Sequence, residues 1–577
     1  MDYSRVFTVA TYSEVFGKSV KVNYLNSALT NFDLLEILGA LSRSNLLIFD
    51  YKKYISNQSL LIRNFFDDKT LKKIQDLAKK IKNDDIHFGK KLLIFNRVQL
   101  LYLFQKSFLL CTKDKNKRKL DLKRDRIKLG QIFLMVNDFV YKAEKKDIDN
   151  LTDKEKKEFF LLYFLKRYEN NNIPHLKHEV VRNKIVFKDI INQDDIKSEF
   201  FRLGIEECFL EENKVDLAEY IEFVFGIIAL FIERLKNPNS FITNPSSSSI
   251  NKKIFSKTNI KSLKVKNFLK SLALEIEKFA NKIEEDMNKF PSNAFISFRQ
   301  FPIVKINQDY FCIDLGFLIE KIGRNIFWQI NNSLPKKNRD KFHIFWGSVF
   351  ERYVDSIFER IYNPSSSLSN FYPHPSPSNN NKELIDGIID YYDSVIILEY
   401  KSSFLPLHVK FSEDIRAFEQ EVKNKLKIKK LAKTIRKMFI EKSLTCEKID
   451  VKKVKKIFSI IVTLEPCYKS ELSNWFINEI FNKYKPSNKG LLIFPLQVIT
   501  MEELEYLEPF LSEGLKFIDI LKERLDFDKN LIRPFSDYIN LKLSSRVKKS
   551  NKFIDREYEK WFTQMKEMFF GKKERQT

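Results

Sequence analysis

At 577 residues the chain is long enough for two to four domains, and a hydrophobic fraction of 44% is enough to fill their cores. The formal net charge of +25 favours a polyanionic partner, either nucleic acid or an anionic membrane surface. A lysine-rich, AT-biased genome would produce part of this excess without function. The longest apolar run, 223–232, falls short of the roughly 20 residues that span a bilayer, which argues against a transmembrane protein.

The sequence predicts a cytoplasmic protein without disulfides. Its five cysteines are far apart and no pair has the spacing of zinc ligands; they are Cys111, Cys208, Cys312, Cys446 and Cys467. Residues 1–18 lack the basic-then-apolar pattern of a signal peptide. His175 and His178 are the only close pair of histidines, and no further ligand type lies near them in the sequence.

Residues 1–235 are expected to form a mainly helical domain, because apolar residues recur there at helical spacing. Within it, 113–128 holds nine basic and three acidic residues. This stretch is either a solvated helix face or loop, or a contact for a phosphate backbone. Residues 236–251, rich in Pro, Asn and Ser, are expected to be a linker or mobile loop, and 252–299 a helical connector.

A second domain is expected over 300–515, beginning with a short hairpin at 301–318 and an amphipathic helix at 343–362. The low-complexity stretch 363–382 is expected to be a disordered loop. Continuous apolar runs predict buried strands at 456–466 and 491–500, the second followed by a helix that a Thr500–Glu503 capping box opens. Residues 516–577 are expected to be a helical, basic extension.

The most informative stretch is 383–403, which the pattern predicts to be a hairpin with a buried second strand. A tight turn at Tyr392-Asp393 would place Asp386 directly opposite Glu399, with Lys401 on the same face. Two carboxylates suit Mg²⁺ or Mn²⁺, and a nearby lysine can orient water or stabilise charge on a phosphate. The alternative is a solvated hairpin end with an ordinary Glu399–Lys401 salt bridge.

This arrangement resembles the PD-(D/E)xK nuclease superfamily, with Asp386, Glu399 and Lys401 as the two acids and the lysine of its motif. Gly347 and Glu351 match the G-x-x-x-E helix that precedes the first core strand in many of these nucleases, where the glutamate helps to hold the metal. Glu351 can equally be an ordinary exposed helix residue. The resemblance implies an α/β restriction-endonuclease-like core, an αβββαβ mixed sheet, joined to the large helical N-terminal region.

One long basic helix is expected from Ser412 onward, with Ser412 as its N-cap. Residues 423–437 contain eight basic residues and no acid, and this face either grips a phosphate backbone or is a solvated surface. The candidate nucleic-acid ligands are Lys423, Lys425, Lys427, Lys429, Lys430, Lys433, Arg436 and Lys437. Related nucleases often carry a glutamine before a leucine in this helix; here Lys430 precedes Leu431, so no role is carried over.

The resemblance implies a metal-dependent nuclease with Mg²⁺ or Mn²⁺ as cofactor and DNA as the expected substrate. Anti-phage defence, restriction or a mobile element follows only by analogy between folds. The alternative is a catalytically silent nucleic-acid-binding or protein-interaction protein with a nuclease-like fold. In the nuclease interpretation, residues 1–235 are expected to determine target choice, activation, a partner protein or a homo-oligomer, and no membrane role is expected.

Overall fold

The structure is a computed structural model that describes residues 8–49, 54–83, 92–111, 124–140, 151–239, 245–257, 262–362, 370–376, 384–444, 448–488, 490–544 and 550–570. Most of the charged stretch 113–128 therefore lies outside the described residues, as does Cys446. The other four cysteines are free thiols, as expected. Among the described helices, none is long and apolar enough to cross a membrane.

The N-terminal region is mainly helical, as predicted. Its helices are α1 (Tyr12–Phe16), α2 (Val22–Leu29), α3 (Leu34–Phe49), α4 (Tyr54–Phe65), α5 (Asp68–Asn83), α6 (Arg97–Leu110), α7 (Arg124–Val140), α8 (Asp153–Asn171), α9 (Leu176–Lys184), α10 (Asp194–Arg202), α11 (Ile205–Asn213) and α12 (Leu217–Arg234). A two-residue parallel pair, β1 (Thr8–Val9) with β2 (Leu92–Leu93), ties the first described residues to the start of α6. The apolar run at 223–232 lies inside α12 and is mostly buried, as a helix of a protein core requires.

A four-stranded sheet follows in the middle of the chain, in the order β3-β6-β5-β4. Its strands are β3 (Ser249–Asn251), β4 (Ala273–Glu275), β5 (Ile303–Ile306) and β6 (Asp309–Cys312). The predicted hairpin at 301–318 is confirmed as β5–β6. The linker expected at 236–251 was wrong in part, since β3 ends it. The helical connector expected at 252–299 was also wrong in part, since β4 lies between its helices α14 (Ser262–Leu272) and α15 (Ile276–Met287). Both strands form through distant partners, β6 and β5, which local composition does not reveal.

A boundary at residue 300 would divide this sheet, because β5 pairs with β4 and β6 pairs with β3. The hairpin is flanked by α16 (Ile296–Gln300) before it, and by α17 (Leu315–Ile322), α18 (Asn325–Ser333) and α19 (Lys336–Ile361) after it. The helix predicted at 343–362 is thus confirmed, and it begins earlier.

A six-stranded sheet occupies the C-terminal half, in the order β11-β10-β9-β8-β7, with β12 also paired to β10. Its strands are β7 (Asn370–Pro373), β8 (Gly387–Asp390), β9 (Ser394–Lys401), β10 (Lys456–Thr463), β11 (Leu492–Ile493) and β12 (Gln497–Thr500). Strands β7, β8 and β9 are antiparallel, whereas β10 runs parallel to β9. The sheet is therefore mixed, as expected, and α19 precedes it in the chain.

Strand β7 corrects the expectation of a disordered loop over 363–382. Asn370–Pro373 pairs with β8 along its whole length, from Asn370 opposite Asp390 to Pro373 opposite Gly387. The Ser, Pro and Asn residues on either side, 363–369 and 377–383, lie outside the described residues. The low-complexity composition of 363–382 gave no indication of this edge strand, which forms by pairing with β8.

Helices cover both faces of this sheet. Ile396, Leu398 and Tyr400 of β9 pack into a cluster with α19 and α24 (Met501–Ser512), whereas Val395 and Ile397 pack with helices on the opposite face. Those helices are α21 (Ile415–Leu426), α22 (Ile428–Ile435) and α23 (Ser473–Asn482). The α21–α22 connection between β9 and β10 is the expected crossover of a parallel pair.

The single helix expected from Ser412 is wrong, because Lys427 adopts a left-handed conformation (φ 50°) and separates α21 from α22. Asp414, rather than Ser412, caps α21 by accepting a hydrogen bond from the backbone N–H of Arg416. The predicted capping box at Thr500 and Glu503 is confirmed at the start of α24.

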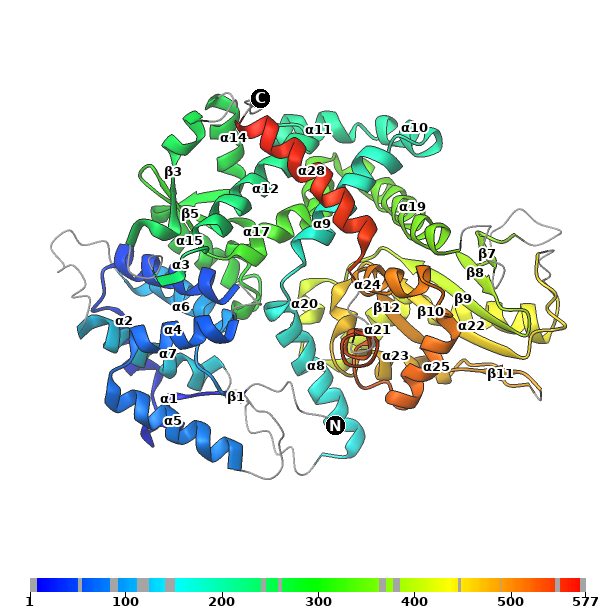
Figure 1. The fold of residues 1–577 in the computed structure, drawn as a ribbon, viewed down its shortest axis with the longest axis horizontal. Coiled ribbons are helices and arrows are strands. Elements are labelled where there is room, and N and C mark those ends of the chain that lie inside the picture. The colour runs from blue at the N-terminus through cyan, green and yellow to red at the C-terminus, as the bar shows by residue number, and fades with distance from the viewer. Residues whose placement is uncertain are drawn as a thin grey trace, which may run out of the picture.

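The C-terminal segment is helical and consists of α25 (Phe517–Phe527), α26 (Phe535–Tyr538) and α28 (Lys552–Phe570). A short helix, α20 (Leu407–Lys410), lies between β9 and α21. In Figure 1 the first helices of the chain (blue) lie on one side of the molecule and the six-stranded sheet lies on the other, with α8, α9 and α28 between them. Helix α28 packs on α9 and α12, where Trp561 meets Phe225 edge-on at 4.3 Å. The C-terminal helix α28 is thus packed against the N-terminal region.

Candidate functional site

The predicted hairpin register is confirmed. Gly387 pairs with Leu398 at the last step of the β8–β9 ladder, so Asp386, one residue before β8, lies in register with Glu399. Val395 to Leu398 are fully buried, as the apolar run indicated. Since side chains alternate along a strand, Glu399 and Lys401 project to the face where Val395 and Ile397 pack with α21–α23.

The acid–acid–lysine set comes together in the structure. Nζ of Lys401 lies 2.5 Å from Oε1 of Glu399 and 3.9 Å from Oδ2 of Asp386. The lysine also donates a hydrogen bond of 2.9 Å to the carbonyl oxygen of Tyr400, and the backbone N–H of Tyr400 donates to Asp386. All three side chains are largely shielded from solvent, with 13% exposed for Asp386 and Lys401 and 5% for Glu399.

The two carboxyl groups of this set are balanced by only one ammonium group, that of Lys401. Burial, and after it the neighbouring Glu399 carboxylate, raise the pKa of Asp386 to about 7, although Lys401 and the Tyr400 N–H act to lower it. The charge of Glu351 also raises the pKa of Asp386. A solvated hairpin end would not produce such a shift, since exposed carboxylates keep their ordinary pKa.

Asp386 and Glu399 fit a divalent cation, because they offer two hard oxygen ligands whose mutual repulsion a cation would relieve. Mg²⁺ is commonly held by one or two carboxylates with water and substrate phosphate as the other ligands. Within the described residues, no group of three or more His, Cys, Asp or Glu side chains is arranged to hold a metal ion. Glu351, the third predicted acid, stands on α19, and its charge acts on Asp386.

The arrangement can support phosphate chemistry. A divalent cation held by Asp386 and Glu399 would supply Lewis-acid activation of a phosphodiester. Lys401 carries three donors on Nζ, of which the structure directs one to Glu399 and one to the Tyr400 carbonyl. The remaining donor can orient a water or bind a phosphate oxygen.

Two residues that the sequence did not single out lie beside this end of the hairpin. Asp355 lies one turn after Glu351 on α19, accepts a hydrogen bond of 3.2 Å from the Tyr400 hydroxyl and lies 2.8 Å from Nε2 of His374. The backbone N–H of His374 donates to the carbonyl oxygen of Asp386. The sequence could have indicated Asp355 only through its position four residues after Glu351. It gave no indication of His374, which lies in the stretch that was expected to be disordered.

A groove of about 540 Å³ opens beside α19 and contains Glu351, Ser348 and His374 in its lining. Its other wall is α10, so the N-terminal region contributes directly to the surface next to the hairpin. Polar groups on this wall pair across the groove: Asp195 of α10 forms an ion pair of 2.8 Å with Arg352 of α19.

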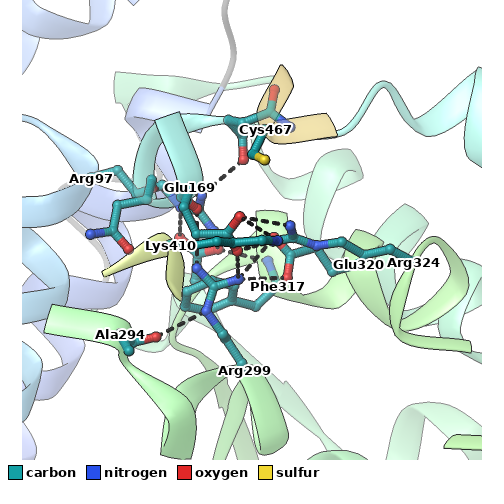
Figure 2. A network of polar contacts seen from close by, with 12 residues as sticks. Arg97, Glu169, Ala294, Arg299, Phe317, Glu320, Arg324, Lys410 and Cys467 are labelled. Carbon is teal, nitrogen blue, oxygen red and sulfur yellow. Dashed lines mark hydrogen bonds and ion pairs between the residues drawn. The ribbon is translucent and has the colours of Figure 1, made fainter. Parts of the chain in front are cut away.

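A buried network of charges, shown in Figure 2, joins side chains of α8, α16, α17 and α20. Glu169 of α8 lies 2.7 Å from Arg324, 3.1 Å from Arg299 and 3.2 Å from Lys410. Glu320 of α17 pairs with the same two arginines, at 2.8 Å and 3.0 Å. Alternating charge keeps each buried ion partnered, which burial requires.

This network reaches the strand that carries Lys401. Lys410 lies 2.9 Å from Glu465, just beyond β10, and Glu465 accepts a hydrogen bond of 2.8 Å from the backbone N–H of Leu405. The backbone N–H of Leu464 donates to the carbonyl of Lys401 at 3.0 Å. The segment after Lys401 is therefore fixed to the N-terminal helices through Glu169.

The predicted basic face lies on the outer surface of α21 and α22. Ile428, Leu431 and Ile435 face the sheet, so the basic side chains point away from it. Lys423 forms an ion pair of 2.9 Å with Glu419, and Lys429 lies 5.8 Å from the centre of the Tyr484 ring. Of the eight basic residues, the exposed ones are Lys427, Lys429, Lys430, Lys433 and Arg436, and the half-buried ones are Lys423, Lys425 and Lys437.

The histidine pair has a structural role. Nδ1 of His178 lies 2.6 Å from Glu505, which also pairs with Arg182 at 2.8 Å and accepts a hydrogen bond of 2.8 Å from Tyr353. His175 packs edge-on against His178 at 4.8 Å.

Comparisons with protein-family models, with curated proteins and with solved structures find no match to this chain.

Proposed function

We propose that the chain is a metal-dependent nuclease that hydrolyses phosphodiester bonds, with DNA as the first substrate to test. The observation that carries the proposal is the convergence of Asp386, Glu399 and Lys401 on one face at the end of the β8–β9 hairpin. The raised pKa of Asp386 supports it, because perturbed carboxyl groups in a shielded site are typical of metal and catalytic centres.

The order of elements gives further support. A helix, three antiparallel strands, a helical crossover and a parallel strand, α19 to β10, is the αβββαβ order that the resemblance to PD-(D/E)xK nucleases implies. In this proposal Asp386 and Glu399 hold the cation, Glu351 of α19 is the third acid that helps to hold it, and Lys401 orients water or contacts the phosphate. The net charge of +25 would draw a polyanionic substrate.

The test is a cleavage assay of the purified full chain with Mg²⁺ or Mn²⁺ on linear, circular and single-stranded DNA and on RNA. We expect cleavage of at least one substrate and a loss of at least about 100-fold in Asp386→Asn and Lys401→Ala, the size expected when a charge-stabilising group is removed. Asp390→Asn, at the other end of β8 from Asp386, is the matched control because its carboxylate lies at the turn, where it accepts a hydrogen bond from the N–H of Tyr392.

Binding without cleavage by the wild-type chain under every metal would replace this proposal with a catalytically silent nucleic-acid-binding protein. Equal cleavage by the wild type and Asp386→Asn would show that the hairpin is not the catalytic site.

A further inference from the structure

A cavity of about 1100 Å³ lies where the N-terminal helices meet the C-terminal half of the chain. Its walls come from α3, α6, α12, the connection between α8 and α9, and the helices α24 and α28. In Figure 1, α8, α9 and α28 lie between the first helices of the chain and the six-stranded sheet. Small-molecule sites commonly occupy about 300–1,000 Å³ between packed domains, so this cavity has room for such a ligand.

The charged side chains that line this cavity leave one cation in excess. Arg97 pairs with Asp314, and Lys177 pairs with Asp555, each at 2.6 Å. Two further lining residues pair with partners outside the lining, Lys236 with Glu233 at 2.6 Å and Glu502 with Lys469 at 2.9 Å. The fourth basic residue of the lining, Arg167, is the cation that remains.

Arg167 lies on α8 one turn before Asn171, and both residues line the cavity, so they share the side of α8 that faces it. Burial raises the pKa of Glu471, and the charge of Arg167 acts to lower it. Within the described part of the chain, however, no carboxylate forms an ion pair with the Arg167 guanidinium group. Its planar fork matches the oxygens of a phosphate or carboxylate, so Arg167 is available to an anionic ligand.

The start of α9 adds backbone donors to the same cavity. His175, the N-cap residue, makes no side-chain cap hydrogen bond, and Leu176, Lys177 and His178 line the cavity with it. Burial lowers the pKa of His175 to about 4, so its ring is neutral at neutral pH. The first N–H groups of a helix lack acceptors within the helix and favour an anion, which adds to the effect of Arg167.

A smaller cavity of about 70 Å³ adjoins the larger one and shares Asn172, Pro174 and Glu502 with it. Trp346 of α19 lines this inner cavity, and its side chain is only 8% exposed. The Nε1–H of Trp346 is buried and has no acceptor among the described residues. Buried N–H groups are nearly always hydrogen-bonded, so this donor indicates a ligand atom or an ordered water at the inner end.

The rest of the lining suits a planar heterocycle. Tyr506 and Tyr558 contribute rings, and Ile232 and Leu235 contribute apolar surface. The side-chain amide of Asn172, which lines both cavities, makes no hydrogen bond within the described residues, so its donors and its acceptor are available. Rings and an amide match the face and the edge of a nucleobase, whereas a fatty acid would need apolar walls alone.

We propose that this cavity binds a nucleotide, with its phosphate held by Arg167 and the start of α9 and its base held by the ring side chains and Asn172. This site goes beyond the proposed nuclease function and does not rest on it, because neither cavity contains Asp386, Glu399 or Lys401 in its lining. Its walls come from both halves of the chain, so a bound nucleotide would stabilise their packing.

The test measures binding of AMP to the full chain in EDTA, by isothermal titration calorimetry and by the shift in thermal unfolding. Adenosine lacks the phosphate, inorganic phosphate lacks the base, and oleate carries its anionic group on an apolar chain. We expect AMP to raise the unfolding temperature and to bind at least about tenfold more tightly than each of the three, the size expected when a charge-assisted hydrogen bond is lost.

Matched variants locate the site. Arg167→Ala should weaken AMP binding by about 10- to 150-fold and leave adenosine binding unchanged, and Arg167→Lys should retain part of the affinity. Lys166→Ala removes the same charge from the next residue, which pairs with Glu413 at 3.5 Å and is not part of the lining, so AMP affinity should stay unchanged. Ile232→Trp removes no polar group but fills the cavity, and it should abolish AMP binding.

Equal AMP affinity in Arg167→Ala and the wild type, or AMP binding no tighter than that of adenosine or phosphate, would overturn the nucleotide proposal. Tighter binding of oleate than of AMP would overturn it too and would assign the cavity to an apolar acid. Asp386→Asn should bind AMP as the wild type does, and a loss of binding in this variant would place the nucleotide at the hairpin instead. The cleavage assay decides the nuclease proposal independently of these results.

Discussion

Asp386 lies in register with Glu399, one residue beyond the last paired residues of the β8–β9 hairpin, Gly387 and Leu398. Two largely buried carboxyl groups in this position repel each other, and Lys401 compensates only part of their charge. This relationship makes the protonation of Asp386 depend on pH near neutrality and links it to the stability of the fold.

The first prediction concerns pH and stability without metal. The pKa of Asp386 is raised to about 7, above the value of about 3.9 for an unfolded aspartate, so the folded state binds more protons between these values. The free energy of unfolding should therefore fall as pH rises from about 4 to about 7 and level off above. Asp386→Asn should remove this part of the slope and exceed the wild type in stability at about pH 8, as measured by urea unfolding.

Millimolar Mg²⁺ at about pH 8 should stabilise the wild type and not Asp386→Asn, because only the ionised carboxylate binds the cation. Asp390→Asn should keep the wild-type slope. Identical pH dependence in the wild type and Asp386→Asn would mean that Asp386 titrates normally.

The second prediction concerns the buried charge network. Burial alone would raise the pKa of Glu169, but the charges of Arg324, Lys410 and Arg299 bring it below its ordinary value. Glu169→Gln should remove the one carboxylate that all three cations contact, leaving Glu320 alone for the two arginines, and reduce the free energy of unfolding by about 3–5 kcal/mol.

Glu413→Gln is the matched control for Glu169→Gln. Its carboxylate pairs with Lys166 at 3.5 Å but is 72% exposed, so its loss should change the free energy of unfolding by about 0.5 kcal/mol or less. Similar effects of the two substitutions in denaturant unfolding would show that the network contributes no more than a surface pair.

The third prediction compares two glycines. A Cβ on Gly387 would lie 3.0 Å from the Tyr400 hydroxyl and 3.1 Å from the Phe371 ring, whereas a Cβ on Gly347 would meet Ser402 at 3.8 Å, an ordinary packing distance. Gly387→Ala should therefore destabilise the fold by about 1–3 kcal/mol through overpacking. Gly347→Ala should be neutral or stabilising by up to about 1 kcal/mol, because alanine favours a helix interior.

Tyr400→Phe removes the crowding hydroxyl, so the double variant with Gly387→Ala should lose less stability than the sum of the single variants. Thermal or denaturant unfolding of the four proteins completes this cycle. Strict additivity would show that the strain at Gly387 does not involve Tyr400.

Much of the hairpin could be predicted from the sequence, because its determinants are local. The apolar run 395–398 indicated a buried strand, and the period of two determined which side chains share a face with Glu399. Counting from the turn then gave the partner of Asp386. The capping box at Thr500 and the β5–β6 hairpin were predictable for the same reason.

The errors arose where distant residues determine the structure. β7 forms because β8 offers it a free edge, although Asn370–Pro373 stands in a low-complexity stretch. The break at Lys427 depends on how α21 and α22 pack on the sheet, since lysine itself does not favour a left-handed conformation. The buried pairs around Glu169 join residues more than a hundred positions apart, and the spacing of single charges gives no sign of them.

The last prediction tests the basic face of α22. Lys429, Lys430 and Lys433 are exposed, and removal of each phosphate-binding lysine should reduce the slope of log K against log salt by about 0.9. Replacing all three by alanine should therefore reduce the slope by up to about 2.7 if this face holds a phosphate backbone, as measured by anisotropy over a range of salt concentrations.

A second triple variant on α5 controls for the overall charge of the chain. Lys69, Lys72 and Lys80 are also exposed, and replacing these three lysines by alanine removes the same net charge. This variant should leave the salt slope nearly unchanged, because α5 lies in the N-terminal region away from the sheet (Figure 1). Equal slopes in the two triple variants would show that α22 contributes only to the general positive charge, which any polyanion would meet without a defined binding face.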